Sequence, residues 1–240
     1  MTDRPVIMSA ASVRAIVAGT KTETRRVIRP QPDPSPGTLT GPHQDCDSGL
    51  WGMVQTTWRF SDRLGNYEPE EEIFRPFRIP EAGDRLWVRE AWAPISPDEH
   101  ERPIRECRIE YRADTTAEAP GHWDEVERGE RPRYARWRPS IHMPRWASRI
   151  TLAVTEVRVE RLQEISRESA IAEGLALASS HIEQFWRWPP PYDEGLWLSP
   201  VAAYRFLWDS LHGEGAWNAN PWVAVIRFVP TLANIDSGGA

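Results

Sequence analysis

Lys21 and Thr24 are the first residues whose types and spacing could do chemistry, within residues 19–26, which read GTKTETRR. Lys21 is the only lysine among 29 basic residues, and the other 28 are arginines. A lysine can lose its proton and act as a base or a nucleophile, whereas an arginine cannot. Burial and the charges of Arg25 and Arg26 would lower the pKa of Lys21, which could then take a proton from Thr24 or from water.

The simpler interpretation is that Lys21 complements a helix dipole. Lys21 follows the end of a predicted helix, and the negative end of a helix dipole favours an ammonium by about 0.3–1 kcal/mol. This is less than one pKa unit, so burial and the neighbouring arginines could outweigh it. From these residues alone, the dipole interpretation is favoured over a catalytic one.

Glu173 is the second candidate because its position offers no stabilisation. It is the last residue before Gly174, at the end of a helix predicted over residues 166–173. A carboxylate is mildly unfavourable at a helix C-terminus. Glu173 is therefore either a solvated side chain, as many at helix ends are, or a functional one.

The third candidate is the segment 131–149, which holds six arginines and no acidic residue in a chain of net charge −6. Aromatic faces stack on bases and arginines hold phosphates, so this segment suits a nucleotide or a single strand. The alternative is an arginine-rich loop whose tryptophans pack on the core. The candidate substrate-binding residues are Arg26, near Lys21, and Trp137, Arg138, His142, Arg145 and Trp146.

The composition excludes several classes of protein. The two cysteines, Cys46 and Cys107, cannot form a disulfide framework, and the six histidines lack zinc spacing, so neither a metal nor a cofactor is expected. A glycine-rich phosphate loop and a Gly-x-Ser-x-Gly elbow are both absent from the sequence. No apolar stretch approaches ~20 residues and no secretory signal is present, which predicts a cytoplasmic protein without membrane contact.

Three short helices and several strands must position the candidate residues. Helices are predicted over 9–18, over 166–173 and from Ser199-Pro200 onward, with serine caps at their starts. Strands are predicted over 20–28, 86–92, 105–112, 150–162 and 222–228. The apolar alternation in the 150–162 strand changes phase at Val157 and Val159, which indicates a bulge or a bend.

The 240 residues predict a single domain over 1–232, with proline-rich insertions near 30–80, 93–135 and 176–198 and a flexible tail over 233–240. Residues 30–50 are expected to form a loop, and residues 51–82 only weak strands. Short strands with peripheral helices and no βαβ rhythm favour an α+β fold built on a compact β-barrel.

The run from Ser9 to Arg26, a helix followed by Ala-Gly and then Lys-Thr-x-Thr, resembles the ASCH family of the PUA-like superfamily. Residues 83–90 (GDRLWVRE) look like the strand that follows a Gly-Asp turn in that family, and residues 220–228 (NPWVAVIRF) look like its final strand. The whole chain is also similar to the tryptophan-rich, ASCH-like proteins of phages and prophages. The resemblance implies a PUA-like β-barrel with peripheral short helices and long insertions.

Small bacterial members of this family are amidohydrolases that remove the acetyl group of N4-acetylcytidine with a lysine, a threonine and a glutamate. The lysine and the second threonine of the Lys-Thr-x-Thr motif in this chain are Lys21 and Thr24, which match the lysine and threonine of that site. The family's glutamate follows a strand and the helix start Leu-x-x-(Leu or Ile)-(Ser or Thr), which matches residues 162–166 and leads to Glu173. The resemblance thus selects the sole lysine and the unfavourably placed acid. This chain is more than twice as long as those small members, and its insertions could cover or reshape the pocket.

Three functions are compatible with these observations. The first is hydrolysis of a modified nucleoside or nucleotide, in which Lys21 activates Thr24 or water, Glu173 handles protons or orients Lys21, and tryptophans sandwich the base. The second is non-catalytic binding of RNA or modified nucleic acid, since other members of the family are thought to bind RNA. The third is a phage morphogenesis-associated protein, which the lack of heptads and repeats disfavours. The expected partner is a nucleoside, a nucleotide or a single-stranded nucleic acid.

Hydrolysis places a demand on the backbone. Lys21, Thr24 and Glu173 must lie within hydrogen-bond reach around one pocket. In an ideal strand, residues three apart point to opposite faces, so Lys21 and Thr24 can face one pocket only if the backbone after Gly19 is irregular.

Overall fold

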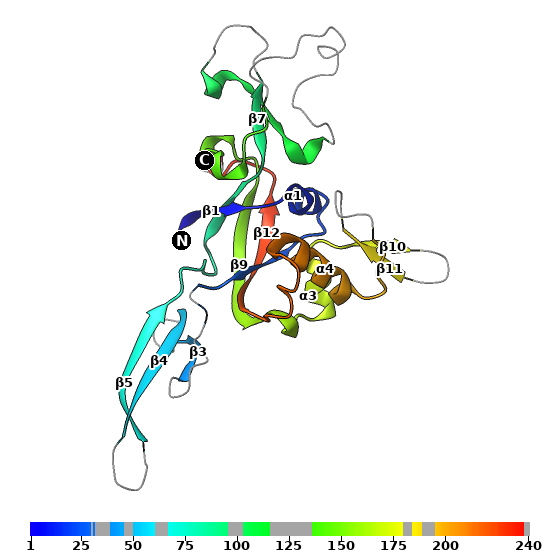
Figure 1. Ribbon diagram of the computed structural model, residues 1–240. Coiled ribbons are helices and arrows are strands. Elements are labelled where there is room, and N and C mark those ends of the chain that lie inside the picture. Colours follow the sequence, from blue (N-terminus) through cyan, green and yellow to red (C-terminus); the bar gives the residue numbers. More distant parts are fainter. Residues whose placement is uncertain are drawn as a thin grey trace.

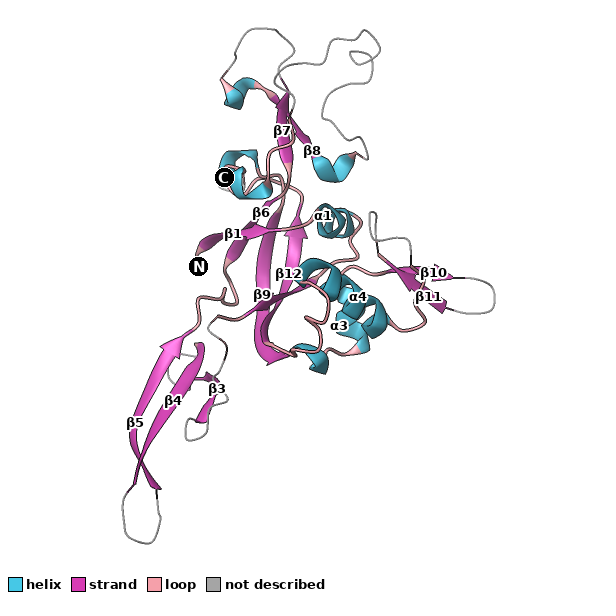
Figure 2. Cartoon of the chain, in the orientation of Figure 1, coloured by secondary structure: helices cyan, strands magenta, loops and turns pink. Residues whose placement is uncertain are grey.

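The computed structural model describes residues 1–29, 31, 39–45, 50–60, 67–95, 103–115, 136–179, 184–188 and 195–237. It is an α+β structure in which sheet predominates and the helices are short (Figures 1 and 2). Much of the insertions expected at 93–135 and 176–198 lies outside the described residues.

The three α-helices among the described residues begin where the sequence predicts. Ser9 caps α1 (Ala10–Val17), and Ser166 caps α3 (Arg167–Ala172); each serine Oγ accepts a hydrogen bond from the backbone N–H three residues on, at 3.2 and 3.1 Å. The longest, α4 (Pro200–His212), has proline in its first turn, where a missing N–H costs no hydrogen bond. The positions of the three helices are therefore confirmed, whereas the cap expected from the Ser199 side chain was wrong, since that side chain makes no capping hydrogen bond.

A five-stranded sheet forms the body of the molecule. Its order is β1 (Asp3–Ile7), β6 (Arg85–Arg89), β9 (Thr151–Arg161), β12 (Trp222–Thr231) and β2 (Glu23–Val27). The β1–β6 pair is parallel and the other neighbouring pairs are antiparallel. Across the described strands no pairing joins β1 to β2, so the sheet is open and the expected closed barrel is not found.

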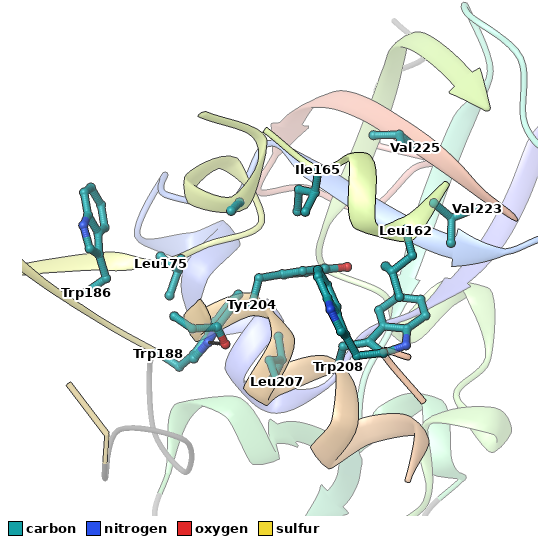
Figure 3. Packing of buried hydrophobic residues seen from close by; sticks show 13 residues of the cluster. Leu162, Ile165, Leu175, Trp186, Trp188, Tyr204, Leu207, Trp208, Val223 and Val225 are labelled. Atoms are coloured by element: carbon teal, nitrogen blue, oxygen red, sulfur yellow. Dashed lines mark hydrogen bonds between the residues drawn. The ribbon is translucent and has the colours of Figure 1, made fainter. Parts of the chain in front are cut away.

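Helices cover both faces of this sheet. Side chains alternate along β12, so Val225 and Ile226 point to opposite faces. Ile226 packs in the cluster that includes Val13 of α1. Val225 packs in the cluster that includes Tyr204 and Trp208 of α4 (Figure 3). The buried side chains of β12 therefore place α1 and α4 on the two sides of the sheet.

The bulge indicated by the apolar alternation is present in β9. Arg227 pairs with Glu156 and Phe228 pairs with Val154, so Thr155 is the extra residue. Leu152 and Val154 are buried and lie before the bulge. The extra residue shifts the alternation of side chains, so the positions after the bulge are out of phase with these two. The prediction of a bulge is confirmed, two residues before the expected position.

Strands also occupy the segments expected to be insertions. A three-stranded antiparallel sheet projects from the body (Figure 1), and two further strand pairs are present. These strands are β3 (Leu39–Gln44), β4 (Trp51–Phe60), β5 (Tyr67–Pro76), β7 (Trp92–Ile95), β8 (Arg108–Tyr111), β10 (Ala176–Ser179) and β11 (Gln184–Arg187). The expectation of strands over 51–82 is confirmed by β4 and β5. The expectation of loop over 30–50 was wrong for residues 39–44, because Gly41 and Pro42 lie in the edge strand β3, where glycine and proline are tolerated.

The single strand expected over 86–92 is two strands, β6 and β7, with a break between them. β6 ends at Arg89 and β7 begins at Trp92. Between them Glu90 is buried and pairs with Arg149 at 2.9 Å, while its backbone N–H donates to the sulfur of Met143. Contacts with distant residues thus replace the strand pairing at this position.

The C-terminal segment is held in place up to Ser237, although a flexible tail was expected from residue 233. Ile235 is only 2% exposed. The Asn234 amide donates to the backbone oxygens of Arg145 and Ser148, at 2.9 and 2.6 Å. The expectation was wrong for residues 233–237 because these partners are remote in sequence; residues 238–240 lie outside the described residues.

Gly174 lies where α1, α3 and Lys21 meet. Its φ of +115° is a backbone conformation that side chains disfavour. A Cβ at this position would lie 2.7 Å from Ala15 Cβ and 3.2 Å from Lys21 Cβ. The close approach of the two helix ends therefore depends on glycine.

We predict that Gly174→Ala lowers the free energy of unfolding by about 2–4 kcal/mol, because backbone strain adds to steric overlap. Gly83→Ala is the matched control: its φ is +91°, but nothing lies within 4 Å of the added Cβ. The control should lose only about 1–2 kcal/mol. Urea titration of the three proteins measures both values, and equal losses would contradict the close approach at Gly174.

Candidate active site

The structure brings Lys21 and Glu173, which are 152 positions apart, into one buried ion pair. Lys21 Nζ lies 2.5 Å from Glu173 Oε2 and also donates to the Glu173 backbone oxygen at 2.8 Å. The two side chains are 3% and 4% exposed. An isolated antiparallel bridge joins the backbones of the same residues. The pair therefore connects the segment after α1 to the end of α3.

The backbone after Gly19 is irregular, as the catalytic hypothesis requires. Gly19 ends α1 with a φ of +74°, and the backbone N–H groups of Thr20 and Lys21 both donate to the oxygen of Ala15. Lys21 lies in the isolated bridge, and β2 begins only at Glu23. Because Lys21 precedes the strand, the strand alternation does not oblige its side chain to point away from that of Thr24.

Two residues that the sequence did not indicate as partners of Glu173 hold its other carboxylate oxygen. Arg25 Nη1 and the Tyr204 hydroxyl each donate to Glu173 Oε1 at 3.3 Å. The Arg25 guanidinium also lies over the Tyr204 ring, 5.7 Å from its centroid. Tyr204 is one of the buried residues of α4; the available signal was that a buried tyrosine hydroxyl needs a polar partner.

Burial and neighbouring charges shift the acidities at this site. Burial lowers the pKa of Lys21, the Glu173 carboxylate opposes this, and Arg26 and Arg25 lower it further. Burial raises the pKa of the Tyr204 hydroxyl well above its usual value, and the Glu173 charge adds to the effect. Tyr204 therefore remains a neutral donor, and Lys21 loses its proton more readily than an exposed lysine.

A network of ion pairs surrounds Arg25. Arg25 Nη2 lies 2.8 Å from Glu160 Oε1, and its Nη1 lies 3.6 Å from Glu23 Oε2. The connected cations are Lys21, Arg25, Arg158 and Arg227, and the connected carboxylates are Glu23, Glu156, Glu160 and Glu173. With four charges of each sign, the network has a formal charge of zero.

Thr24 lies on the other face of β2 from Arg25. Thr24 pairs with Ile226, which packs against α1, whereas Arg25 pairs with Val225, which packs against α4. Thr24 is 4% exposed. Within the described ranges, no hydrogen bond joins its hydroxyl to Lys21 or Glu173.

Arg26 shares the face of Thr24, because alternate residues of a strand point the same way. Its Nη2 donates to the Ile7 backbone oxygen at 2.5 Å and lies 3.3 Å from the Met8 sulfur. Ile7 is the last residue of β1. Arg26 thus connects the two edge strands of the open sheet.

The five candidates from the arginine- and tryptophan-rich segment lie apart from Lys21. They lie in or next to the short helices η3 (Ser140–His142) and η4 (Arg145–Ala147), and η4 contacts the C-terminal segment through the hydrogen bond from Asn234 to the Arg145 backbone oxygen. No hydrogen bond, ion pair or ring contact between described residues joins this group to the Lys21–Glu173 pair. These candidates are Trp137, Arg138, His142, Arg145 and Trp146.

Several of these side chains contact other residues of the chain. The Arg112 guanidinium lies 5.5 Å from the Trp137 ring centroid. Arg138 lies over Trp92 at 5.2 Å, and Trp92 also contacts Trp146 edge to face. His142 is exposed. Part of the aromatic surface expected to stack on bases is therefore used within the chain.

Arg145 is engaged by two carboxylates. Its Nη2 lies 2.6 Å from both Asp3 Oδ2 and Asp236 Oδ1. Hydrogen bonds to Asp236 and Asp3 raise the pKa of Arg145, and the same bonds hold the pKa values of both aspartates below their usual range. In this arrangement Arg145 ties β1 and the C-terminal segment to η4.

Comparison with protein-family models, curated proteins and solved structures finds no match to this chain. In the described portion of the chain, no helix is long and apolar enough to cross a membrane. The same residues contain no group of three or more His, Cys, Asp or Glu placed to hold a metal ion. The Lys21–Glu173 pair is therefore chosen as the candidate site because of its burial and its short ion pair.

We predict that Glu173→Gln lowers the free energy of unfolding by about 3–5 kcal/mol, because it removes the carboxylate that Lys21 and Arg25 share. The control is Glu168→Gln, an exposed position in the same helix, which should change stability by no more than about 0.5 kcal/mol. Denaturant unfolding tests both, and similar values for the two variants would show that the buried pair does not stabilise the fold.

We also predict that the stability lost in Arg145→Gln depends on pH. The folded pKa values of Asp3 and Asp236 lie below the ordinary 3.8, so their pairing stabilises the fold above that pH. This stability is lost as the pH falls through the folded values. The deficit of the variant should therefore be full at pH 7 and shrink below pH 3.8. Melting temperatures across pH test this, with the exposed Arg136→Gln as control; a constant deficit would contradict the assignment.

Proposed function

We propose that this chain is a hydrolase of the ASCH type that removes an acyl group from a modified nucleoside or nucleotide, of which N4-acetylcytidine is the model substrate. The observation that carries the proposal is the buried pair between the only lysine and Glu173, at 2.5 Å. The short motifs at 19–26 and 162–166 relate these two residues and Thr24 to the site of the small amidohydrolases.

In this proposal the Lys21–Glu173 pair moves the proton. Transfer of a proton from Lys21 Nζ to Glu173 Oε2 leaves a neutral amine, which the lowered pKa of Lys21 favours. The amine then takes a proton from Thr24 or from water, whose oxygen attacks the amide carbonyl carbon. The carbon–nitrogen bond breaks as Lys21 gives the proton that it took to the leaving amine. If water attacks, the carboxylate forms in this step; if Thr24 attacks, its oxygen carries the acyl group as an ester, which a water activated by Lys21 then hydrolyses. One water is consumed overall, and the products are the free base amine and a carboxylate.

Arg25 and Tyr204 are positioning residues in this scheme. Both donate to Glu173 Oε1, which leaves Oε2 directed at Lys21.

A PUA-like barrel is part of the same proposal. The five-stranded sheet curves so that Arg26 of β2 reaches the Ile7 backbone oxygen at the end of β1. This contact supports a barrel in which the Arg26 side chain, and not strand pairing, joins the edge strands β1 and β2.

The second candidate is a non-catalytic binder of RNA or modified nucleic acid. The arginines and tryptophans around η3 and η4 favour it. However, Arg145 pairs with Asp3 and Asp236, and Arg149 pairs with Glu90 and Asp114. These carboxylates neutralise charge that a phosphate backbone would need, so the hydrolase is the better supported proposal. No observation favours the phage morphogenesis role.

The test is incubation of the protein with N4-acetylcytidine, its 5′-monophosphate and an acetylated oligonucleotide, followed by mass analysis of the products. We expect loss of the acetyl group and release of acetate. Binding of the oligonucleotide without hydrolysis of any substrate would instead support the second candidate.

Lys21→Arg should lower kcat by about 10²–10⁴-fold, because a guanidinium keeps its proton and cannot act as a base. The exposed Glu168→Gln should keep the activity of the unchanged protein. A melting curve checks that Lys21→Arg is folded; if it is not, Thr24→Val tests the same mechanism. A folded Lys21→Arg protein with unchanged kcat would remove Lys21 from the mechanism.

A further inference from the structure

Arg26 is a partly buried cation without a carboxylate partner in the described structure. Arg25, Arg158 and Arg227 each form ion pairs with glutamates, whereas Arg26 forms none. Its Nη2 contacts only neutral acceptors, the Ile7 backbone oxygen and the Met8 sulfur. Its Nε is buried and has no hydrogen-bond partner.

The neighbouring ion-pair network cannot supply the missing charge. Its four carboxylates already face four cations, so Arg26 adds one uncompensated positive charge beside it. Burial lowers the pKa of Arg26, and the Glu173 carboxylate only partly opposes this. A guanidinium does not lose its proton near neutral pH, so an anion that is not among the described residues would be needed to balance it.

A second hydrogen-bond donor lies on the same strand face. Thr24 is two residues before Arg26 in β2, and alternate strand residues are about 7 Å apart on one face. In the part of the chain that is described, the Thr24 hydroxyl has no hydrogen-bond partner. A hydroxyl and a guanidinium at this separation can both reach one group with several oxygen atoms.

We infer that Arg26 and Thr24 form a subsite for an anionic oxygen group of the ligand, namely a phosphate or a carboxylate. The guanidinium fork matches both groups, because each presents two oxygens in its plane. The assignment of this anion to a substrate rests on the proposed function. In that reaction a nucleotide would bring a phosphate, and deacylation would release a carboxylate.

The experiment measures anion binding directly and requires no turnover. Melting temperatures of the unchanged protein, Arg26→Gln and Arg29→Gln are recorded with inorganic phosphate, with acetate, and with sodium chloride at matched ionic strength. Arg29 is the control because it is exposed and lies three residues further along the chain. Phosphate or acetate should raise the melting temperature of the unchanged protein and of Arg29→Gln by about 3–6 °C at tenfold the dissociation constant, and should leave Arg26→Gln unchanged.

The two anions distinguish the two sources. A shift with phosphate alone supports the phosphate of a nucleotide, and a shift with acetate alone supports a carboxylate. No shift beyond sodium chloride, or the same shift in Arg26→Gln, overturns the subsite. If Arg26→Gln does not fold, loss of the shift in Thr24→Val supports the subsite and its retention overturns it. Anion binding without deacylation would leave the subsite in place and reject only the proposed function.

Discussion

A charged amine cannot be removed from water without a partner, and the structure around Lys21 follows from this constraint. The partner is Glu173, whose carboxylate is also the meeting point of Arg25 and Tyr204. These four side chains come from the segment after α1, from β2, from the end of α3 and from α4. One buried carboxylate therefore links the elements on both sides of the sheet.

The backbone is adapted to the same point. Gly174 lets the end of α3 approach Ala15 of α1 and the side chain of Lys21 more closely than any larger residue would permit. Gly19 turns the chain out of α1, so that Lys21 lies before the regular strand. The position of the ammonium is thus set by two helix ends as well as by its ion pair.

The distribution of charge distinguishes structural arginines from one that is available for binding. Most described arginines near the site lie within a network whose charges cancel, and at the C-terminal end Arg145 is likewise neutralised by aspartates. Arg26 differs because its neighbours are a carbonyl and a thioether. An arginine-rich sequence therefore does not by itself define an anion-binding surface, since carboxylates within the fold occupy much of the positive charge.

The sequence alone determined the features that depend on a few neighbouring residues. These include the serine caps at Ser9 and Ser166, the glycine after α1, the phase change in β9 and the unusual positions of Lys21 and Glu173. Only the tertiary structure decided that Tyr204 and Arg25 hold Glu173, that Arg145 is neutralised, and that the segments expected to be insertions form strands. The physical reason is one of range: caps and turns are satisfied within one helical turn, whereas buried charges and strand edges are satisfied by partners that only the folded chain brings near.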